Sequence, residues 1–217
     1  MPVVRSHTAP FINIKYQTKS DLIKAESALS KLDQGPTGNR LIYELSKLSK
    51  NGKSLTIVAD RKTTSGAMPT LTKSQVQRFG VSEDEYNIEH NDRANKLAQK
   101  RRFGFKGKGT SAIVRWNPSL SVHVSDEGIH SAVNDEKEAF ISLAHELIHG
   151  YRMMKGTYTA DHSDRYEPGT RSYKEEQRAV GLGIHSNRSF SENSIRNESK
   201  MNLRAKYVID ENLSYIG

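Results

Sequence analysis

The chain has 217 residues, of which 33 are Lys or Arg and 25 are Asp or Glu, so its formal net charge is +8. It contains no cysteine, which excludes a disulfide framework, a cysteine-based zinc site and a cysteine nucleophile. Its apolar runs are far shorter than the ~20 residues of a membrane-spanning helix, and the N-terminus lacks the apolar run of a secretory signal peptide.

The positive charge lies in the N-terminal half. Residues 1–110 hold 20 basic and 10 acidic residues, whereas residues 111–217 hold 13 and 15. The densest part is the Gly-rich segment 100–108, with Lys100, Arg101, Arg102, Lys106 and Lys108. Such a surface attracts anionic partners, nucleic acid first among them, although a solvated loop is the simpler interpretation. Aromatic residues make up only 7%, and no recognised nucleic-acid motif accompanies the segment, so the sequence disfavours a nucleic-acid partner.

The first half of the chain predicts a leader, two helices and a strand. Residues 1–18 are polar with few apolar anchors, and we expect a flexible leader that could serve as a secretion signal. Residues 19–217 are expected to form one domain. Apolar periodicity predicts helices from about Ser20 to Gln34 and from Gly38 to Ser49, followed by a strand at Ser54–Ala59. The polar residues 60–110 give no clear assignment.

The second half has stronger patterns. Two β-type runs, Ser111–Trp116 and Ser121–Ser125, are joined by Asn117-Pro118 and predict a hairpin. A helix is predicted from Asn134 or Asp135 to Lys155, where Gly156 ends it. After a loop, further helices are expected at Tyr173–Leu182 and near Asn193–Lys200.

The helix ending at Lys155 contains the motif HExxH at His145-Glu146-Leu147-Ile148-His149. The i, i+4 spacing places both imidazoles on one helix face, so both rings can bind one zinc ion. Glu146 lies beside the first ligand, where its carboxylate can take a proton from water activated by zinc and pass it to a leaving amine. The motif therefore predicts a zinc hydrolase, whereas two ordinary helical histidines are the simpler alternative.

A catalytic zinc usually has three protein ligands and one open position. A third His with the spacing HExxHxxGxxH is excluded, because Arg152 and Lys155 occupy the positions that need Gly and His. The favoured third ligand is Glu176, since the small Ala179 one turn later permits close packing against the first helix. Glu175 is the alternative, because adjacent helical residues lie ~100° apart and only one can face the ion. Weaker candidates are Asp161, His162, Asp164 and His185.

The transition state needs a hydrogen-bond donor in addition to the metal. Tyr166 is the favoured donor and is assigned a catalytic role, with Tyr173 as the alternative and Arg165 or Arg178 as possible helpers. An exposed edge of the predicted hairpin could pair with an extended peptide. The expected fold is therefore α+β: a compact, zincin-like single domain in which a small β-sheet or hairpin precedes the HExxH helix and a downstream helix supplies a Glu ligand.

Four blocks in the second half together resemble a known family. They are His145–His149, Asp164-Arg165-Tyr166-x-Pro168, Lys174–Leu182 and Ser191–Arg196. This ordered series resembles the NleD-like family of bacterial type III secretion effector proteases. The similarity covers about residues 105–207, and in the first hundred residues it consists mainly of the helical pattern and Gly35-Pro36-Thr37-Gly38.

The resemblance implies a zinc endopeptidase of Glu-zincin type, with one Zn²⁺ per chain, that a type III system injects into the host cell cytoplasm. Members of this family cleave host MAP kinases within the activation loop and so suppress immune signalling. At the matching positions His145 and His149 would be metal ligands and Glu146 the catalytic carboxylate, whereas the resemblance does not decide between Glu175 and Glu176. A monomer with a host protein substrate and no membrane partner is expected.

Two other hypotheses concern binding. Lys47, Lys50 and Lys53 precede Leu55 and Ile57, a pattern similar to the short motifs that bind the acidic docking groove of MAP kinases. A strand following a solvated helix end explains the same pattern without any docking. The alternative functions for the whole chain are a basic nucleic-acid-binding module and a non-catalytic module that docks a kinase.

Overall fold

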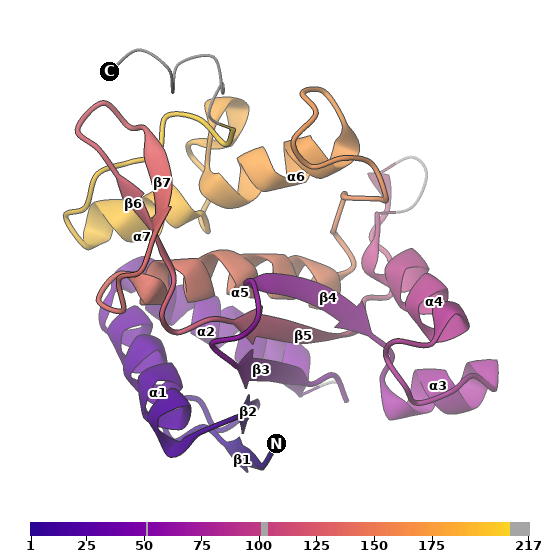
Figure 1. Cartoon of the computed structure of the whole chain (residues 1–217). Coiled ribbons are helices and arrows are strands. Elements are labelled where there is room, and N and C mark those ends of the chain that lie inside the picture. Colours follow the sequence, from indigo (N-terminus) through magenta and orange to yellow (C-terminus); the bar gives the residue numbers. More distant parts are fainter. Residues whose placement is uncertain (51, 101–103, 209–217) are drawn as a thin grey trace.

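The computed structural model describes residues 1–50, 52–100 and 104–208, and its sheet and helices form an α+β arrangement (Figure 1). The strands are β1 (Val3–Arg5), β2 (Ile12–Tyr16), β3 (Leu55–Ala59), β4 (Gly66–Thr70), β5 (Ser111–Trp116), β6 (Ser121–Val124) and β7 (His130–Val133). The helices are α1 (Lys19–Gln34), α2 (Pro36–Ser49), α3 (Lys73–Phe79), α4 (Ile88–Ala98), α5 (Ala139–Lys155), α6 (Arg171–Val180) and α7 (Glu192–Glu198), with a short 3₁₀ helix, η2 (Gly183–His185).

Five strands form a mixed sheet in the order β1-β2-β3-β5-β4. The three inner strands are parallel, and β1 and β4 are antiparallel to their neighbours at the two edges. The register places Ile12 beside Leu55, and Leu55 beside Ala112. Side chains alternate across a strand, so these residues share one face, where each is at most 1% exposed.

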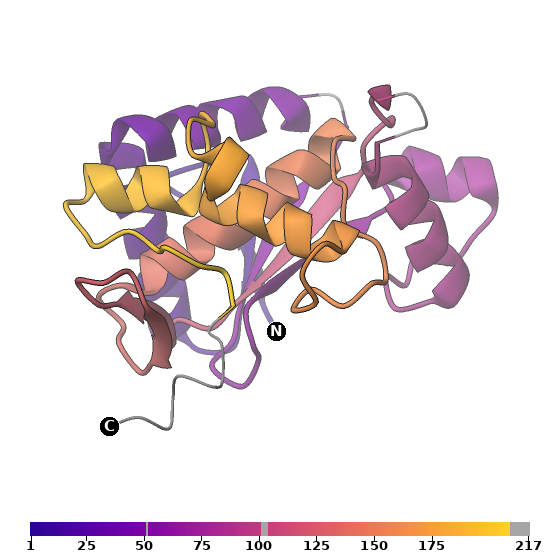
Figure 2. The same cartoon turned by 90° about the horizontal axis from the view of Figure 1, so that it is seen from above.

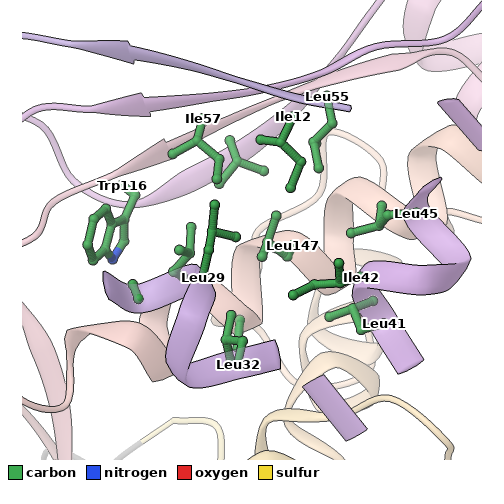
Figure 3. Close-up of a cluster of buried hydrophobic side chains, with 14 of the residues drawn as sticks. Ile12, Leu29, Leu32, Leu41, Ile42, Leu45, Leu55, Ile57, Trp116 and Leu147 are labelled. Carbon is green, nitrogen blue, oxygen red and sulfur yellow. The ribbon is translucent and has the colours of Figure 1, made fainter. Parts of the chain in front are cut away.

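The buried face of the sheet is covered by α1, α2 and α5, which share one hydrophobic core with it (Figure 3). Helix α5 lies directly against β5, and Gly150 faces side chains of Leu55 and Val114 in the sheet. Trp116, at the end of β5, donates a hydrogen bond of 2.9 Å from Nε1 to the carbonyl oxygen of Ala139. The sheet therefore fixes both the depth and the start of α5.

The ends of the predicted helices agree closely with the structure. Helices α1 and α2 and strand β3 occupy the predicted segments, and α6 and α7 begin one or two residues before the predicted positions. Helix α5 ends where Gly156 adopts a left-handed conformation with φ 72°, as the sequence indicated. It begins at Ala139 rather than at Asn134 or Asp135, because residues 136–138 form a turn. The α+β class is thus confirmed. No helix in the described part of the chain is long and apolar enough to cross a membrane.

The expectation of a flexible leader at residues 1–18 is wrong for this segment. It contains the two strands β1 and β2, and Ile12 and Ile14 are completely buried. The short stretch Ile12–Tyr16 has the alternating pattern of a strand, and it pairs in parallel with β3 along its full length. Pairing with a strand some forty residues away stabilises a segment whose own composition offers few anchors.

The predicted hairpin of residues 111–125 is also wrong, although both runs are strands. Both edges of β5 are occupied, by β3 and β4, while β6 pairs with β7 in a separate two-stranded sheet. The Asn117 side chain donates to the carbonyl oxygens of Arg61 and Thr63, at 2.8 and 3.1 Å. These bonds tie the end of β5 to the loop after β3, so the chain leaves the sheet instead of folding back in a tight turn.

The unassigned segment 60–110 contains β4, α3 and α4. The two helices are short and pack mainly through a small separate cluster of Leu71, Val76 and Ala94. Their ends are defined by polar caps, such as the Thr72 side chain that accepts from the Gln75 backbone N–H. Weak apolar periodicity explains why these elements could not be assigned from the sequence. Of the basic segment 100–108, Arg101 and Arg102 lie outside the described residues.

The proposed kinase-docking motif does not have the exposure it would need. Leu55 and Ile57 are completely buried in β3. The Lys53 ammonium donates hydrogen bonds to the carbonyl oxygens of Lys108 and Met154, and burial lowers its pKa. Lys53 therefore satisfies carbonyl groups near the end of α5 rather than presenting a free charge, and the motif hypothesis is wrong.

Candidate metal centre

Helix α5 lies between the sheet and the helices α6 and α7 (Figures 1 and 2). The HExxH histidines are on the side of α5 that contacts α6 and α7. Leu143 and Leu147 point into the core and are 0% exposed, so the polar residues between them are turned to the opposite side. Even there, Glu146 is 8% and His149 3% exposed, because α6, α7 and the C-terminal segment cover them. The apolar anchors of α5 thus set the orientation of its polar face.

Helix α6 brings Glu176 to the two histidines. Its Oε2 atom lies 3.0 Å from Nε2 of His145 and 3.2 Å from Nε2 of His149, and the two nitrogen atoms are 3.1 Å apart. Ala179, completely buried one turn later, allows the close packing of α6 on α5. Thr170 caps the start of α6, and Gly181 ends it in a left-handed conformation.

These three ligand atoms fit a metal ion. Among the described residues, His145, His149 and Glu176 form the group of His and acidic side chains whose ligand atoms converge closely enough to hold one. Two imidazole nitrogens and one carboxylate oxygen are a donor set that catalytic zinc uses. The two Nε2 atoms lie within hydrogen-bond distance, so in the neutral cluster one ring can donate its N–H to the other, and a shared cation can take the place of that proton.

The outer nitrogen of His145 is held by Glu192 on α7. Nδ1 of His145 lies 3.0 Å from Oε2 of Glu192, and an ionised carboxylate can only accept, so this contact leaves Nε2 with its lone pair towards the centre. Glu192 also accepts from Arg196 at 2.8 Å and from Arg204 at 3.1 Å. These cations hold the pKa of the fully buried Glu192 below its ordinary value in spite of burial.

Glu175 occupies the corresponding position near His149. Its Oε1 lies 3.9 Å from Nδ1 of His149, while Arg152 binds both carboxylate oxygens and Thr159 donates its backbone N–H at 3.1 Å. Burial acts to raise the pKa of Glu175, but the nearby His149 ring and the hydrogen bonds from Arg152 outweigh this and lower it. Adjacent residues of α6 therefore face different partners, Glu176 the pair of Nε2 atoms and Glu175 the arginine.

The electrostatics of the centre favour cations. Burial acts to lower the pKa of His145, but hydrogen bonds to Glu176 and Glu192 raise it to about 9. Burial likewise opposes the charge of His149, whose pKa Glu176 and Glu175 raise to about 10. Conversely, the pKa of Glu176 is lowered by the two histidines although burial acts to raise it. The cluster thus binds positive charge, whether protons or a metal ion.

A pocket of about 250 Å³ opens above the cluster. Glu146 lines it beside His145, and burial raises the pKa of the Glu146 carboxyl while the two histidines act to lower it. Arg165 reaches in from the rim, with Nη1 3.5 Å from Oε1 of Glu176. The outer edge of β4, which pairs with no other strand among the described residues, lies alongside, because Ser65, the residue before β4, also lines the pocket.

The other residues predicted to act at the site lie at the rim of the pocket or outside it. Tyr166 lines the rim of the pocket, is 62% exposed, and stacks on Tyr207 with ring centroids 6.1 Å apart. Tyr173 contacts Tyr207 edge-on. The weaker ligand candidates Asp161, His162, Asp164 and His185 do not join the metal-binding group of the described residues.

Sequence reasoning missed Glu192 and Tyr207. Glu192 belongs to the last block of the family resemblance and is spaced i, i+4 from Arg196, a signal that was present but pointed to no role. Tyr207 comes from a polar C-terminal segment without periodicity, and only the folded chain places it in the pocket, where burial raises the pKa of its phenol.

A metal-binding group beside the Glu of an HExxH helix, at the base of an open pocket, has the composition of a zinc metalloprotease site. The model of the family Peptidase_M91, described as "Effector protein", matches residues 13–207. The chain belongs to this family, the NleD-like effector family, and is a zinc metalloprotease.

Solved structures that the chain matches in part include botulinum neurotoxin light chains. The light chain of Clostridium botulinum neurotoxin serotype F is 15% identical with a TM-score of 0.49, over 87% of this chain and 68% of that chain. The catalytic domain of the same serotype is 18% identical with a TM-score of 0.42, over 82% and 46%. The botulinum neurotoxin type G light chain is 12% identical with a TM-score of 0.42, over 94% and 61%. No curated protein sequence matches the chain.

The first prediction concerns Glu192. In Glu192→Gln we expect zinc affinity to fall by about 10- to 100-fold, because the partner that orients His145 loses its charge. Competition with a chromophoric chelator measures the affinity, and circular dichroism checks the fold. Glu89→Gln, on the exposed surface of α4, is the matched control. Equal zinc affinity in folded Glu192→Gln and in the control would contradict this role.

The second prediction concerns pH. The raised pKa values of His145 and His149 mean that the metal-free cluster holds protons at pH 7, and zinc must displace them. Because the two nitrogens are 3.1 Å apart, the pair holds its first proton more tightly than its second. We expect at least one proton released per zinc at pH 7, and an affinity that falls about tenfold per unit as the pH drops below 9. Calorimetry in buffers of different ionisation enthalpy measures the release, and an affinity independent of pH would refute it.

Proposed function

We propose that the chain is a zinc-dependent endopeptidase that a type III system delivers into the host cytoplasm, where it cleaves MAP kinases within the activation loop. Membership of an effector peptidase family supports the protease and its delivery. The kinase target is supported by the four sequence blocks that resemble the NleD-like effectors. The convergence of His145, His149 and Glu176 beside Glu146 is the single observation that carries the catalytic part.

His145, His149 and Glu176 are the proposed ligands of one zinc ion. When bound, zinc supplies a Lewis acid that polarises the scissile carbonyl and lowers the pKa of water towards ~7. Glu146 acts as the general base that accepts the proton of the attacking water and then as the general acid that delivers it to the leaving amine. Its raised pKa suits the second step, because a carboxyl group that ionises less readily holds the proton until the amine takes it.

A polypeptide substrate is supported by the free edge of the sheet. β4 is a terminal strand of the sheet, and the residue before it lines the metal pocket. Met68 and Pro69 of β4 line a neighbouring cleft together with Tyr158, whose ring contacts that of His149 edge-on. An extended peptide that pairs with β4 would therefore pass along the metal pocket. This edge takes the place of the hairpin edge predicted from the sequence.

The donor to the developing oxyanion is proposed to come from the tyrosine pair above the pocket. Tyr166 is the residue favoured by the sequence, and Tyr207 stacks on it and is within the electrostatic influence of Glu176 and Arg165. Because Tyr166 is 62% exposed, its hydroxyl is in an environment where a hydrogen bond contributes less than in the shielded position of Tyr207. Stacking on Tyr207 gives Tyr166 a second role, because it holds the Tyr207 ring in place.

The contributions of Tyr166 and Tyr207 can be distinguished by phenylalanine substitutions, which remove one hydroxyl and keep both rings. We expect Tyr207→Phe to lower kcat by about 10²- to 10³-fold with little change in KM, as for loss of one oxyanion donor, and Tyr166→Phe to change it by less than about tenfold. Steady-state kinetics on a peptide substrate measures both. The reverse order of effects would assign the donor to Tyr166.

The function itself is tested by Glu146→Gln. We expect peptide cleavage to fall by about 10²- to 10⁴-fold while zinc content stays at the wild-type level, because the change removes the proton acceptor but no proposed ligand. Host lysate is incubated with wild type, Glu146→Gln or the surface control Glu89→Gln, and new N-termini are identified by mass spectrometry.

The outcomes separate the parts of the proposal. New termini within MAP kinase activation loops, produced by wild type and Glu89→Gln only, support it in full. Termini in other proteins alone would refute the kinase target and leave the endopeptidase intact. Full activity in Glu146→Gln would refute the catalytic assignment. Equal kinase binding by wild type and Glu146→Gln with no cleavage by either would indicate a docking module instead.

A further inference from the structure

A second pocket, of about 300 Å³, lies between α2, α5, α6 and the segment 188–190. In Figure 2 the chain between α6 and α7 passes over α5 and beside α2, which brings these elements together. The pocket is rich in cationic side chains, namely Arg40, Arg152, Lys155, Arg178 and Arg188, whereas Glu44 is the one acidic residue among those that line it. We call this set the basic pocket.

Two aromatic rings hold two of these cationic side chains in place. Tyr151 and Phe190 meet edge-on with centroids 5.3 Å apart and form one wall. The Arg40 guanidinium lies 5.8 Å from the centre of the Phe190 ring, and the Lys155 ammonium lies 4.9 Å from the centre of the Tyr151 ring and donates to its hydroxyl. Cation–π contacts of this kind hold cations at defined places without neutralising them.

The charge of the basic pocket is largely uncompensated. Within the described part of the chain, Arg152 is paired with Glu175, and Glu44 is paired with Lys47. No carboxylate of the described residues forms an ion pair with Arg40, Arg178 or Arg188. Close by, the pKa of His185 is lowered by burial and by Arg178, Arg188 and Arg152, which indicates a positive potential strong enough to oppose further charge. Cations gathered at this density repel one another unless an anion joins them.

We propose that the basic pocket binds a small anion with more than one phosphate group. Guanidinium groups present paired N–H donors that match phosphate oxygens, and three unpaired arginines from different segments can surround several phosphates. The volume lies at the lower end of the ~300–1,000 Å³ typical of small-molecule sites, which exceeds the needs of a single phosphate and favours a compact polyphosphorylated molecule. A concave pocket between four segments is also unlike the continuous basic groove that tracks a nucleic-acid backbone.

The basic pocket adjoins the metal centre through one residue. Arg152 lines the pocket, while its guanidinium binds Glu175, which in turn lies 3.9 Å from Nδ1 of His149. Arg40 and Arg188 are exposed and contact none of the proposed ligands. The pocket can therefore be altered at its outer side without touching the catalytic residues.

Isothermal titration calorimetry on the full zinc-loaded chain at ~0.15 M salt tests the proposal. The probes are inorganic phosphate, pyrophosphate, ATP, inositol hexakisphosphate and a short RNA oligonucleotide. We expect saturable binding of the probes with several phosphates and weaker binding of inorganic phosphate. In Arg40→Gln/Arg188→Gln the affinity should fall by about tenfold or more for each arginine removed.

A matched control separates the pocket from the overall charge. Arg78→Gln/Arg93→Gln removes two exposed arginines of α3 and α4 and lowers the net charge equally; it should bind the probes as wild type does. Equal losses in the two double variants would overturn the proposal, since they would reflect general attraction or removal of zinc by the probe. Failure of every multi-phosphate probe to bind wild type, or preferred binding of the RNA, would also overturn it. These outcomes do not depend on peptidase activity, so they leave the proposed function untouched.

Discussion

The structure depends on the burial of two imidazoles and their carboxylate partners in one place. His149 and Glu176 are almost fully buried, and a charged group in that position is costly unless it is paired. Each histidine therefore has a carboxylate towards the centre and another near its outer nitrogen, Glu192 for His145 and Glu175 for His149. Arginines in turn neutralise those outer carboxylates. Helices α6 and α7 and the C-terminal segment lie on α5 because they supply these partners.

The sheet contributes by fixing α5 rather than by supplying catalytic residues. Its covered face holds one side of the helix in the core, and Trp116 donates a hydrogen bond to the carbonyl oxygen of the first residue of the helix. The opposite side of α5 is then free to carry His145, Glu146 and His149 into a pocket. A rigid helix between two layers keeps the ligand atoms in place, which a metal site needs for affinity.

Local patterns in the sequence predicted α5, its end at Gly156 and the placement of Glu176 rather than Glu175 towards the two histidines. The periodicity of the helix and the small Ala179 determine which side of α6 packs on α5. Patterns of this kind cannot predict pairing between distant segments. The strands of residues 1–18 and the separation of β5 from β6 depend on partners elsewhere in the chain, and the hairpin prediction failed for that reason. Glu192 and Tyr207 were missed because their roles arise only when α7 and the C-terminal segment fold over α5. Of the five cations of the basic pocket, only Arg40 comes from the N-terminal half that holds the positive net charge, so the overall charge did not reveal the pocket.

The central claim is that one zinc ion is held by His145, His149 and Glu176. Anomalous diffraction at the zinc absorption edge, from crystals of the full chain, tests it most directly. The account predicts one strong peak per chain, about 2.0–2.2 Å from Nε2 of both histidines and from a carboxylate oxygen of Glu176. A peak bound to Glu175 instead, a peak away from the two histidines, or no peak in zinc-loaded protein would contradict it.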